Sequence, residues 1–208
     1  MNDHEPAPSP EEMLRLIEQQ QTAAMRRFLP DPLLMYVPWG AAWFIGFGTL
    51  FLGQGLQGDG NGLLPITWQV GLSVLWATQI IAFVLMVIAV LRSGGHIKGE
   101  SETRGAMYGL AWFIGFNAMG IIATRFVPHL QEDTIGPFYT ALFMLVAGLL
   151  YMAGGAIYRL WPQFLLGVWV VVVDVVGTVL GGGWIYLLLA VLGGGGAVAT
   201  GLWLRRRR

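Results

Sequence analysis

Three polar side chains lie deep inside apolar stretches of this sequence, and they are its best candidates for chemistry. Gln79 and Asn117 carry amides, and Asp174 carries a carboxyl group. At a similar depth on membrane helices, such groups could bind a small solute or pass a proton. An ionised carboxylate in hydrocarbon costs at least about 2.5 kcal/mol. We therefore expect Asp174 to face protein or water, to be hydrogen-bonded, and to be open to protonation at neutral pH.

The same residues also have a purely structural interpretation, in which their hydrogen bonds hold helices together, because membrane helices use Asn, Gln and Asp in this way. Asn117 and Asp174 each follow a tryptophan by five residues. Five residues turn a helix by about 500°, which places the polar position about 140° from the tryptophan. If one of the two faces the bundle, the other can face lipid. The sequence leaves both interpretations open.

These tryptophans belong to a repeated stretch. The sequence AWFIGF occurs at 42–47 and again at 111–116, and a weaker copy, VWVVVV, begins at Val168. Each copy leads into a second apolar run that ends in an arginine, and the Trp-to-Arg separations are 49, 47 and 36 residues. Such a repeat predicts an architecture. We expect three helical hairpins, at about 33–92, 105–160 and 163–205, all in the same orientation around a pseudo-threefold axis.

The composition predicts a membrane protein. Apolar residues make up 55% of the chain and charged residues 12%, and the mean hydropathy is +0.62. Apolar runs lie at about 33–52, 66–91, 105–126, 137–160, 163–180 and 184–204, each close to the ~20 residues that cross a bilayer. The predicted fold is all-α and polytopic, with six transmembrane helices in a domain at 33–208.

Small residues recur where helices would have to pack closely. Ala42 with Gly46 and Ala111 with Gly115 form equivalent small-xxx-small pairs, which favour close helix contacts in lipid. The glycine run 193–196 could mark a break in the last helix. Close packing is the preferred interpretation, because no proline accompanies these glycines.

The polar segment 1–32 is expected to form a cytoplasmic tail without a signal peptide. Ser9, Pro10 and Glu12 have the spacing of a helix start with a capping box. The helix should run to Leu29 and lie on the membrane surface with an amphipathic stripe. A frayed, partly disordered tail is the alternative.

The charge distribution predicts the orientation in the membrane. Eleven of the twelve basic residues fall on one side of the six-span arrangement, so the positive-inside rule makes both termini cytoplasmic. Tryptophans near the span ends suit interfacial anchors: Trp39, Trp68, Trp161, Trp184 and Trp203. Eleven arginines, one lysine and 30 glycines suggest a GC-rich bacterial genome, so the expected location is the bacterial plasma (inner) membrane.

Several classes of site are not indicated by the sequence. There is no cysteine, hence no disulfide framework or thiolate metal site. No nucleotide fingerprint, paired zinc histidines or catalytic triad is present, so no cofactor and no enzyme activity are expected. His129, Glu132 and Asp133 are better explained as a solvated surface than as a cation site. The basic C-terminus is better explained by membrane orientation and contact with lipid headgroups than by binding of nucleic acid.

The whole pattern resembles a group of six-span integral membrane proteins from actinomycetes. The resemblance rests on residues 11–14 leading to 19–21, the Trp-x-x-Gly-Phe repeats at 43–47 and 112–116, the stretch LLYMAGG at 149–155, and the glycine run before a basic end. Proteins of this group are described loosely as membrane proteins or transporters. The resemblance implies a membrane location and possible transport, and it brings no assigned site residues.

Two classes of function remain. The preferred hypothesis is a permease or channel for a small solute, coupled to protons through Asp174, with Asn117 and Gln79 beside it. The alternative is a non-transporting partner that anchors or regulates another membrane complex. The expected partners are the lipid bilayer, a small solute or protons, and a second copy or another membrane protein. Water or substrate near Asp174 would favour the permease, whereas a dry core with an open apolar face would favour the partner role.

Overall fold

The computed structural model describes residues 9–16, 31–94 and 100–206, and every regular element among them is a helix. Six spans are long and apolar enough to cross a membrane, which confirms the predicted number. The elements are α2 (Pro32–Gln54), α3 (Trp68–Gly94), α4 (Glu100–Thr124), the 3-10 turn η1 (Val127–His129), α5 (Glu132–Ile157), α6 (Trp161–Leu180), α7 (Trp184–Leu188), the π-helical segment η2 (Leu189–Gly193) and α8 (Gly194–Arg206). The last three form the sixth span.

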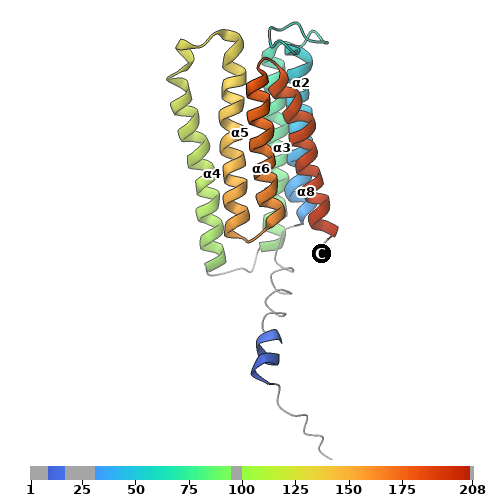
Figure 1. The fold of residues 1–208 in the computed structure, drawn as a ribbon, viewed down its shortest axis with the longest axis vertical. Coiled ribbons are helices and arrows are strands. Elements are labelled where there is room, and N and C mark those ends of the chain that lie inside the picture. Colours follow the sequence, from blue (N-terminus) through green and yellow to red (C-terminus); the bar gives the residue numbers. More distant parts are fainter. Residues whose placement is uncertain (1–8, 17–30, 95–99, 207–208) are drawn as a thin grey trace, which may run out of the picture.

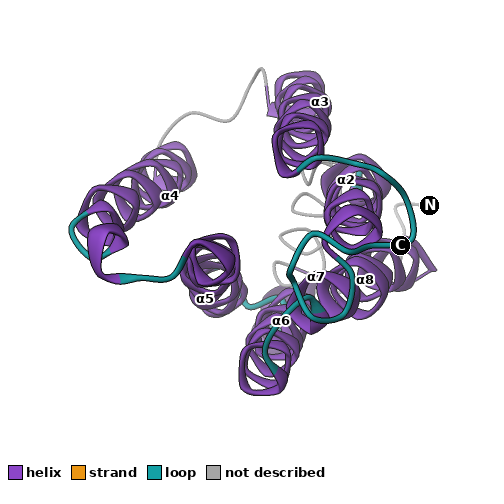
Figure 2. Ribbon diagram, turned by 90° about the horizontal axis from the view of Figure 1, so that it is seen from above, coloured by secondary structure: helices purple, strands orange, loops and turns teal. Residues whose placement is uncertain are grey.

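The helices stand side by side in an arc (Figure 1). Viewed along the bundle, their order is α3, α2, the sixth span, α6, α5 and α4 (Figure 2). Sequential helices are therefore neighbours, except that α3 and α4 form the two ends of the arc. The first and last spans pack against each other at its centre. Pro32 and Arg206 consequently lie at the same end of the bundle.

Pairs of glycines bring the backbones of neighbouring helices into contact. A Cβ atom on Gly40 of α2 would lie 2.6 Å from the carbonyl oxygen of Gly194 in α8. A Cβ atom on Gly167 of α6 would lie 2.6 Å from the carbonyl oxygen of Gly148 in α5. Real Cβ atoms do not approach an oxygen this closely, so glycine is required at both crossings. We call these crossings the α2/α8 seam and the α5/α6 seam.

The two identical hexapeptides pack differently. A Cβ atom on Gly46 of α2 would lie 2.9 Å from Cα of Leu75 in α3, which confirms the predicted close contact. On Gly115 of α4 the nearest heavy atom would be Cγ1 of Val146, at 3.5 Å. That separation is ordinary van der Waals contact, so the prediction of a close approach is wrong for Gly115. Unlike α2, α4 is not held by a glycine crossing there.

The glycine run in the sixth span does not break the helix. Helical backbone continues from Trp184 to Arg206, with one π-helical segment at Leu189–Gly193. Such a segment disturbs the regular ladder of backbone hydrogen bonds. The carbonyl oxygen of Leu192 accepts a bond of 2.8 Å from the indole N–H of Trp169 in α6. Gly194 lies in the α2/α8 seam, so close packing, the preferred interpretation of the run, is confirmed there.

The predicted helix start near the N-terminus is also confirmed. Residues 10–16 are helical. The backbone N–H of Ser9 donates to Oε2 of Glu12 at 2.8 Å, and the N–H of Glu12 donates to Oγ of Ser9 at 3.2 Å. These two bonds form the expected capping box. The amphipathic stripe predicted as far as Leu29 lies largely outside the described residues.

The α5/α6 seam predicts that one added methyl group at Gly167 destabilises the protein. In a Gly167→Ala variant the new Cβ would lie 2.6 Å from both the Gly148 oxygen and the Met152 nitrogen. We expect a loss of about 1–3 kcal/mol and a lower melting temperature in detergent. The control is Gly109→Ala, where no heavy atom lies within 4 Å; it should gain up to about 1 kcal/mol from helix propensity. Equal melting temperatures for the two variants would contradict the seam.

Candidate functional site

A cavity of about 3740 Å³ lies between the two arms of the arc. Helices α2 and α3 line one side, α4 and α5 line the other, and Tyr186 of α7 closes the back. Its volume is several times the ~300–1,000 Å³ of common ligand pockets. Lining residues near the arc ends remain exposed, with Trp76 of α3 at 55% and Phe113 of α4 at 66%. The cavity therefore opens sideways between α3 and α4.

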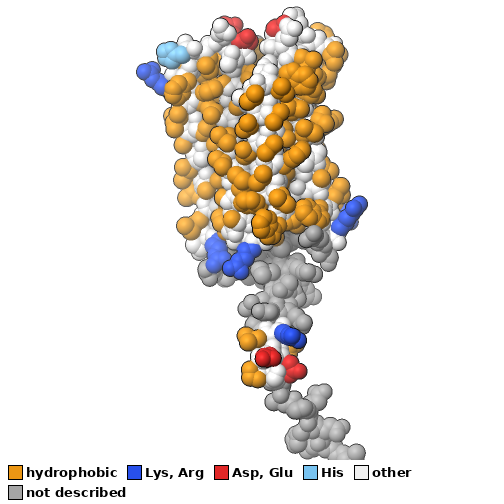
Figure 3. Space-filling view, in the orientation of Figure 1, with side chains coloured by type: hydrophobic (Ala, Val, Ile, Leu, Met, Phe, Trp, Pro, Cys, Tyr) orange, Lys and Arg blue, Asp and Glu red, His pale blue; other side chains and the backbone are white. Residues whose placement is uncertain are grey.

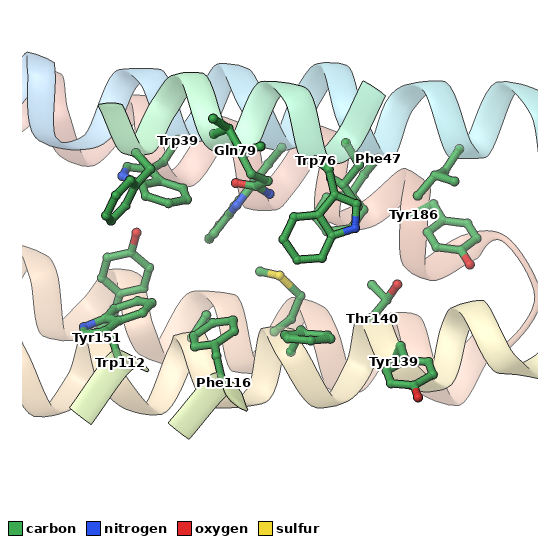
Figure 4. A pocket seen from close by; sticks show the side chains of 18 of the residues that line it. Trp39, Phe47, Trp76, Gln79, Trp112, Phe116, Tyr139, Thr140, Tyr151 and Tyr186 are labelled. Atoms are coloured by element: carbon green, nitrogen blue, oxygen red, sulfur yellow. The ribbon is translucent and has the colours of Figure 1, made fainter. Parts of the chain in front are cut away.

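Aromatic rings form both walls of the cavity (Figure 4). The wall from α2 and α3 carries Trp39, Trp43, Phe47 and Trp76, and the wall from α4 and α5 carries Trp112, Phe116, Tyr139 and Tyr151. The ring of Tyr151 contacts Trp43 edge-to-face at 6.4 Å and Trp112 at 5.3 Å. Two tryptophans of the repeated sequence thus meet at one tyrosine. The third, Trp169, does not line this cavity.

Ring contacts also attach α4 to α5. Phe116 lies 5.4 Å from Phe143, and Tyr108 lies 5.8 Å from Tyr158, measured between ring centroids. Edge and tilted ring pairs of this kind add about 0.5–1.5 kcal/mol each beyond their burial. They space the two helices apart, because large side chains separate backbones that glycines would bring together.

Two of the three predicted site residues face this cavity. Gln79 of α3 and Asn117 of α4 line it from opposite arms. The Oε1 atom of Gln79 is buried and has no hydrogen-bond partner among the described residues. One N–H of the Asn117 amide donates to the carbonyl oxygen of Phe113 at 2.7 Å, and the amide keeps a second N–H and its oxygen. Both residues therefore carry hydrogen-bond donors as well as acceptors.

Asp174 lies elsewhere. It is 3% exposed within the packing of α6 and is not among the residues that line the cavity. Facing protein agrees with the expectation for a carboxyl group in hydrocarbon. Its Oδ1 atom, however, has no hydrogen-bond partner among the described residues, although a bond was expected. The structure thus brings Gln79 and Asn117 to one cavity and places Asp174 in a separate helix contact.

The sequence interpretation missed a chain of polar side chains at one end of the cavity. The hydroxyl of Tyr36 in α2 donates to Oε1 of Gln163 in α6 at 3.1 Å. Nε2 of Gln163 donates to the hydroxyl of Tyr108 in α4 at 3.3 Å, and this hydroxyl donates to the Leu150 carbonyl of α5 at 2.8 Å. We call these side chains the Tyr36–Gln163–Tyr108 chain. It joins the two arms of the arc.

A glycine makes room for this chain. A Cβ atom on Gly154 of α5 would lie 2.6 Å from Cζ of Tyr108. Gln163 itself directly follows Pro162 near the first turn of α6, where the sequence indicated a short connection. Gln163 is only 8% exposed, because α2 and α4 are placed around it. The local sequence around Gln163 does not predict the placement of these two helices.

The two ends of the cavity carry opposite charges. Asp59, Glu132 and Asp133 line one end, and Arg104 and Arg159 line the other. Figure 3 shows the acidic side chains at the top of the bundle and most arginines at the base. We call these the acidic end and the arginine end. Bonds from the side chain and backbone N–H of Asn61, at 2.9 and 3.1 Å, hold the pKa of Asp59 below its usual value, so Asp59 stays ionised near neutral pH.

Two of the tryptophans near the span ends also line the cavity. These are Trp39 and Trp68, of which Trp68 begins α3 and is 57% exposed. His129, Glu132 and Asp133 form no cluster that could hold a metal ion, and the residues that the structure describes contain no other such group.

Searches against protein-family models, curated proteins and solved structures all gave no match. The function therefore has to be argued from the cavity and its residues.

The Tyr36–Gln163–Tyr108 chain predicts the effect of removing its central amide. Gln163→Leu keeps the approximate size but leaves the buried hydroxyl of Tyr36 without an acceptor. We expect a loss of about 1–3 kcal/mol, seen as a lower melting temperature in detergent. Gln131→Leu is the control, because Gln131 is exposed and makes no side-chain capping bond; it should melt like the parent. A Gln163→Leu variant as stable as the parent would show that the chain does not hold the arms together.

Proposed function

We propose that this protein is a membrane permease or channel for a small solute and that the cavity is its path. The observation that supports this is the extent of the cavity, which reaches from the acidic end of the bundle to the arginine end. Gln79 and Asn117 lie between those ends and could bind a solute in passage. The Tyr36–Gln163–Tyr108 chain crosses the arginine end and would act as its gate.

Proton coupling through Asp174 is the second part of the proposal. A buried carboxyl group with an unpartnered oxygen is costly in the membrane interior, which favours a functional reason for keeping it. Asp174 does not line the cavity, so it would act through α6. It follows Gln163 by eleven residues, which is three helical turns with about 20° of rotation. Both side chains therefore lie on one face of α6, and a change of packing around Asp174 on protonation would pass along this face to Gln163 and the gate.

The expected orientation belongs to the same proposal. Both termini would be cytoplasmic in a bacterial plasma membrane, with the arginine end inside. The three sequence repeats would then be hairpins that enter the membrane in the same direction. The arc order agrees with such hairpins, since α2 and α3, α4 and α5, and α6 and the sixth span are neighbours.

The orientation can be tested by cysteine labelling, because the natural chain has no cysteine. We expect Asp59→Cys to react with an impermeant maleimide on intact cells and Arg206→Cys to react only after the cells are opened. Both side chains are exposed, so accessibility within the protein does not limit either reaction. Labelling of position 206 but not position 59 on intact cells would invert the proposed topology.

A second candidate function is a non-transporting partner of another membrane complex. One observation favours it: α4 packs mainly against α5 and leaves large apolar side chains exposed, including Ile114, Ile121 and Ile122. Lipid covers such a face as readily as a partner helix does. The permease is preferred because the partner role gives no reason for a cavity with acidic residues at one end and arginines at the other.

The permease is tested by flux into liposomes that contain the purified protein. Proton entry is followed with an internal pH-sensitive dye, and entry of glycerol, urea or alanine is followed by light scattering. We expect flux above protein-free liposomes. Asn117→Trp should reduce it by replacing a polar lining group with a bulky apolar one, whereas Ile121→Trp, at a position that is 72% exposed and outside the cavity lining, should not. No flux of protons, of these solutes or of an organic cation would overturn the permease in favour of the partner role.

The role of Asp174 has its own test. Asp174→Asn keeps the size of the side chain and removes its titration, so we expect flux, or its dependence on pH, to be lost. Expression and melting temperature should stay close to those of the parent, because the buried oxygen makes no bond that the amide would break. A variant with parental flux at every pH would remove Asp174 from the proposal.

A further inference from the structure

The polar and aromatic atoms of the cavity indicate the charge of its ligand. We infer that the cavity binds a lipophilic organic cation, which enters from the membrane between α3 and α4. This inference rests on the proposed function, since the same cavity is the path, and it names the class of solute. Two features of the lining support the charge of this ligand, the aromatic walls and the placement of charged residues, and the oxygen of Asn117 adds one acceptor.

One hydrogen-bonding group of the lining is held in a fixed position. A side-chain N–H of Asn117 is bound to the Phe113 carbonyl of its own helix, which fixes the amide. The oxygen of this amide accepts a hydrogen bond from a ligand with N–H donors, or contacts positive charge spread over a ligand's surface.

The aromatic walls favour the same charge. Rings of α2 and α3 face rings of α4 and α5 across the cavity (Figure 4). The face of an aromatic ring is electron-rich, so a cation between two such walls is attracted by both, and the attraction is stronger where the cation is desolvated. Trp76 is labelled on the upper wall beside Gln79, and Phe116 lies on the lower wall. A cation at this depth would touch both polar and aromatic groups.

The charges at the ends complete the argument. Asp59, Glu132 and Asp133 line the acidic end, and they would raise the local concentration of cations there. Arg104 and Arg159 line the far end, and the described residues that line the cavity between the ends include no Lys or Arg. The side opening next to Trp76 and Phe113 is apolar, so a ligand with a large hydrocarbon body can arrive through lipid. The volume of about 3740 Å³ accommodates several aromatic rings.

The test uses two probes of the same shape and opposite charge, tetraphenylphosphonium and tetraphenylborate. Binding of each is measured by equilibrium dialysis against the full chain in nanodiscs of zwitterionic phosphatidylcholine, with protein-free nanodiscs subtracted. We expect saturable binding of tetraphenylphosphonium and none of tetraphenylborate above the lipid background. Because the shapes match, the difference reports charge.

Variants locate the site. Trp76→Ala and Asn117→Leu should each weaken tetraphenylphosphonium binding by roughly tenfold, the size expected for one strong cation–π contact or one lost acceptor. Both positions are exposed at the cavity, so folding should be retained and is checked by the melting temperature. Trp161→Ala is the matched control, because Trp161 is 71% exposed and does not line the cavity; it should bind like the parent.

Three outcomes would overturn the inference. Tetraphenylphosphonium binding no greater than in protein-free nanodiscs is the first, and binding unaffected by both cavity variants is the second. The third is saturable tetraphenylborate binding that Arg104→Gln abolishes, which would identify an anionic amphipath instead. Equilibrium binding is separate from flux: binding without any flux would support this inference and count against the permease, and flux without binding would do the reverse.

Discussion

Close approach of helix backbones at glycine is the constraint on which the rest of this structure depends. In lipid there is no hydrophobic force between apolar helices, so packing contacts must supply the attraction. Gly40 with Gly194 and Gly148 with Gly167 supply it at the centre of the arc. Because these seams hold α2 to α8 and α5 to α6, the arms on either side are fixed in direction. The cavity is the space that remains between the two arms.

The number and approximate limits of the helices could be predicted from the sequence, because a span needs only a local run of about 20 apolar residues. The runs predicted at 105–126 and 137–160 begin earlier in the structure, at Glu100 and Glu132. The packing of those helices could not be predicted. Gly46 and Gly115 occupy the same position in identical hexapeptides, yet Gly46 lies against the backbone of Leu75 and Gly115 has space for a Cβ atom. The difference is set by neighbouring helices, and a hexapeptide contains no information about them. The spacing of small residues thus predicts a helix face that permits close approach, but it does not predict which helix packs against that face.

In the candidate site, too, the residues could be predicted from the sequence but their arrangement in space could not. Gln79 and Asn117 could be selected because polar residues are rare inside membrane spans. Both line one cavity because of the order of the helices around the arc. This order could not be predicted, since helical periodicity fixes angles only within one helix. The expected separation of Trp112 from Asn117 did not put them in different surroundings: both line the cavity, because it is wide. Gln163 was missed because a position beside proline at a helix start looks like a connection.

The helices differ in how firmly they are held, and this bears on how a path could open. Helix α6 is fixed on two sides, by the α5/α6 seam and by the bond from Trp169 to the Leu192 carbonyl. Helix α4 has no glycine crossing at Gly109 or Gly115 and is attached to α5 through rings and the hydroxyl of Tyr108. Elements with few buried contacts cost least to displace. Since α4 carries Tyr108, Trp112 and Asn117, moving it against a rigid arc would change the gate, one aromatic wall and one acceptor together.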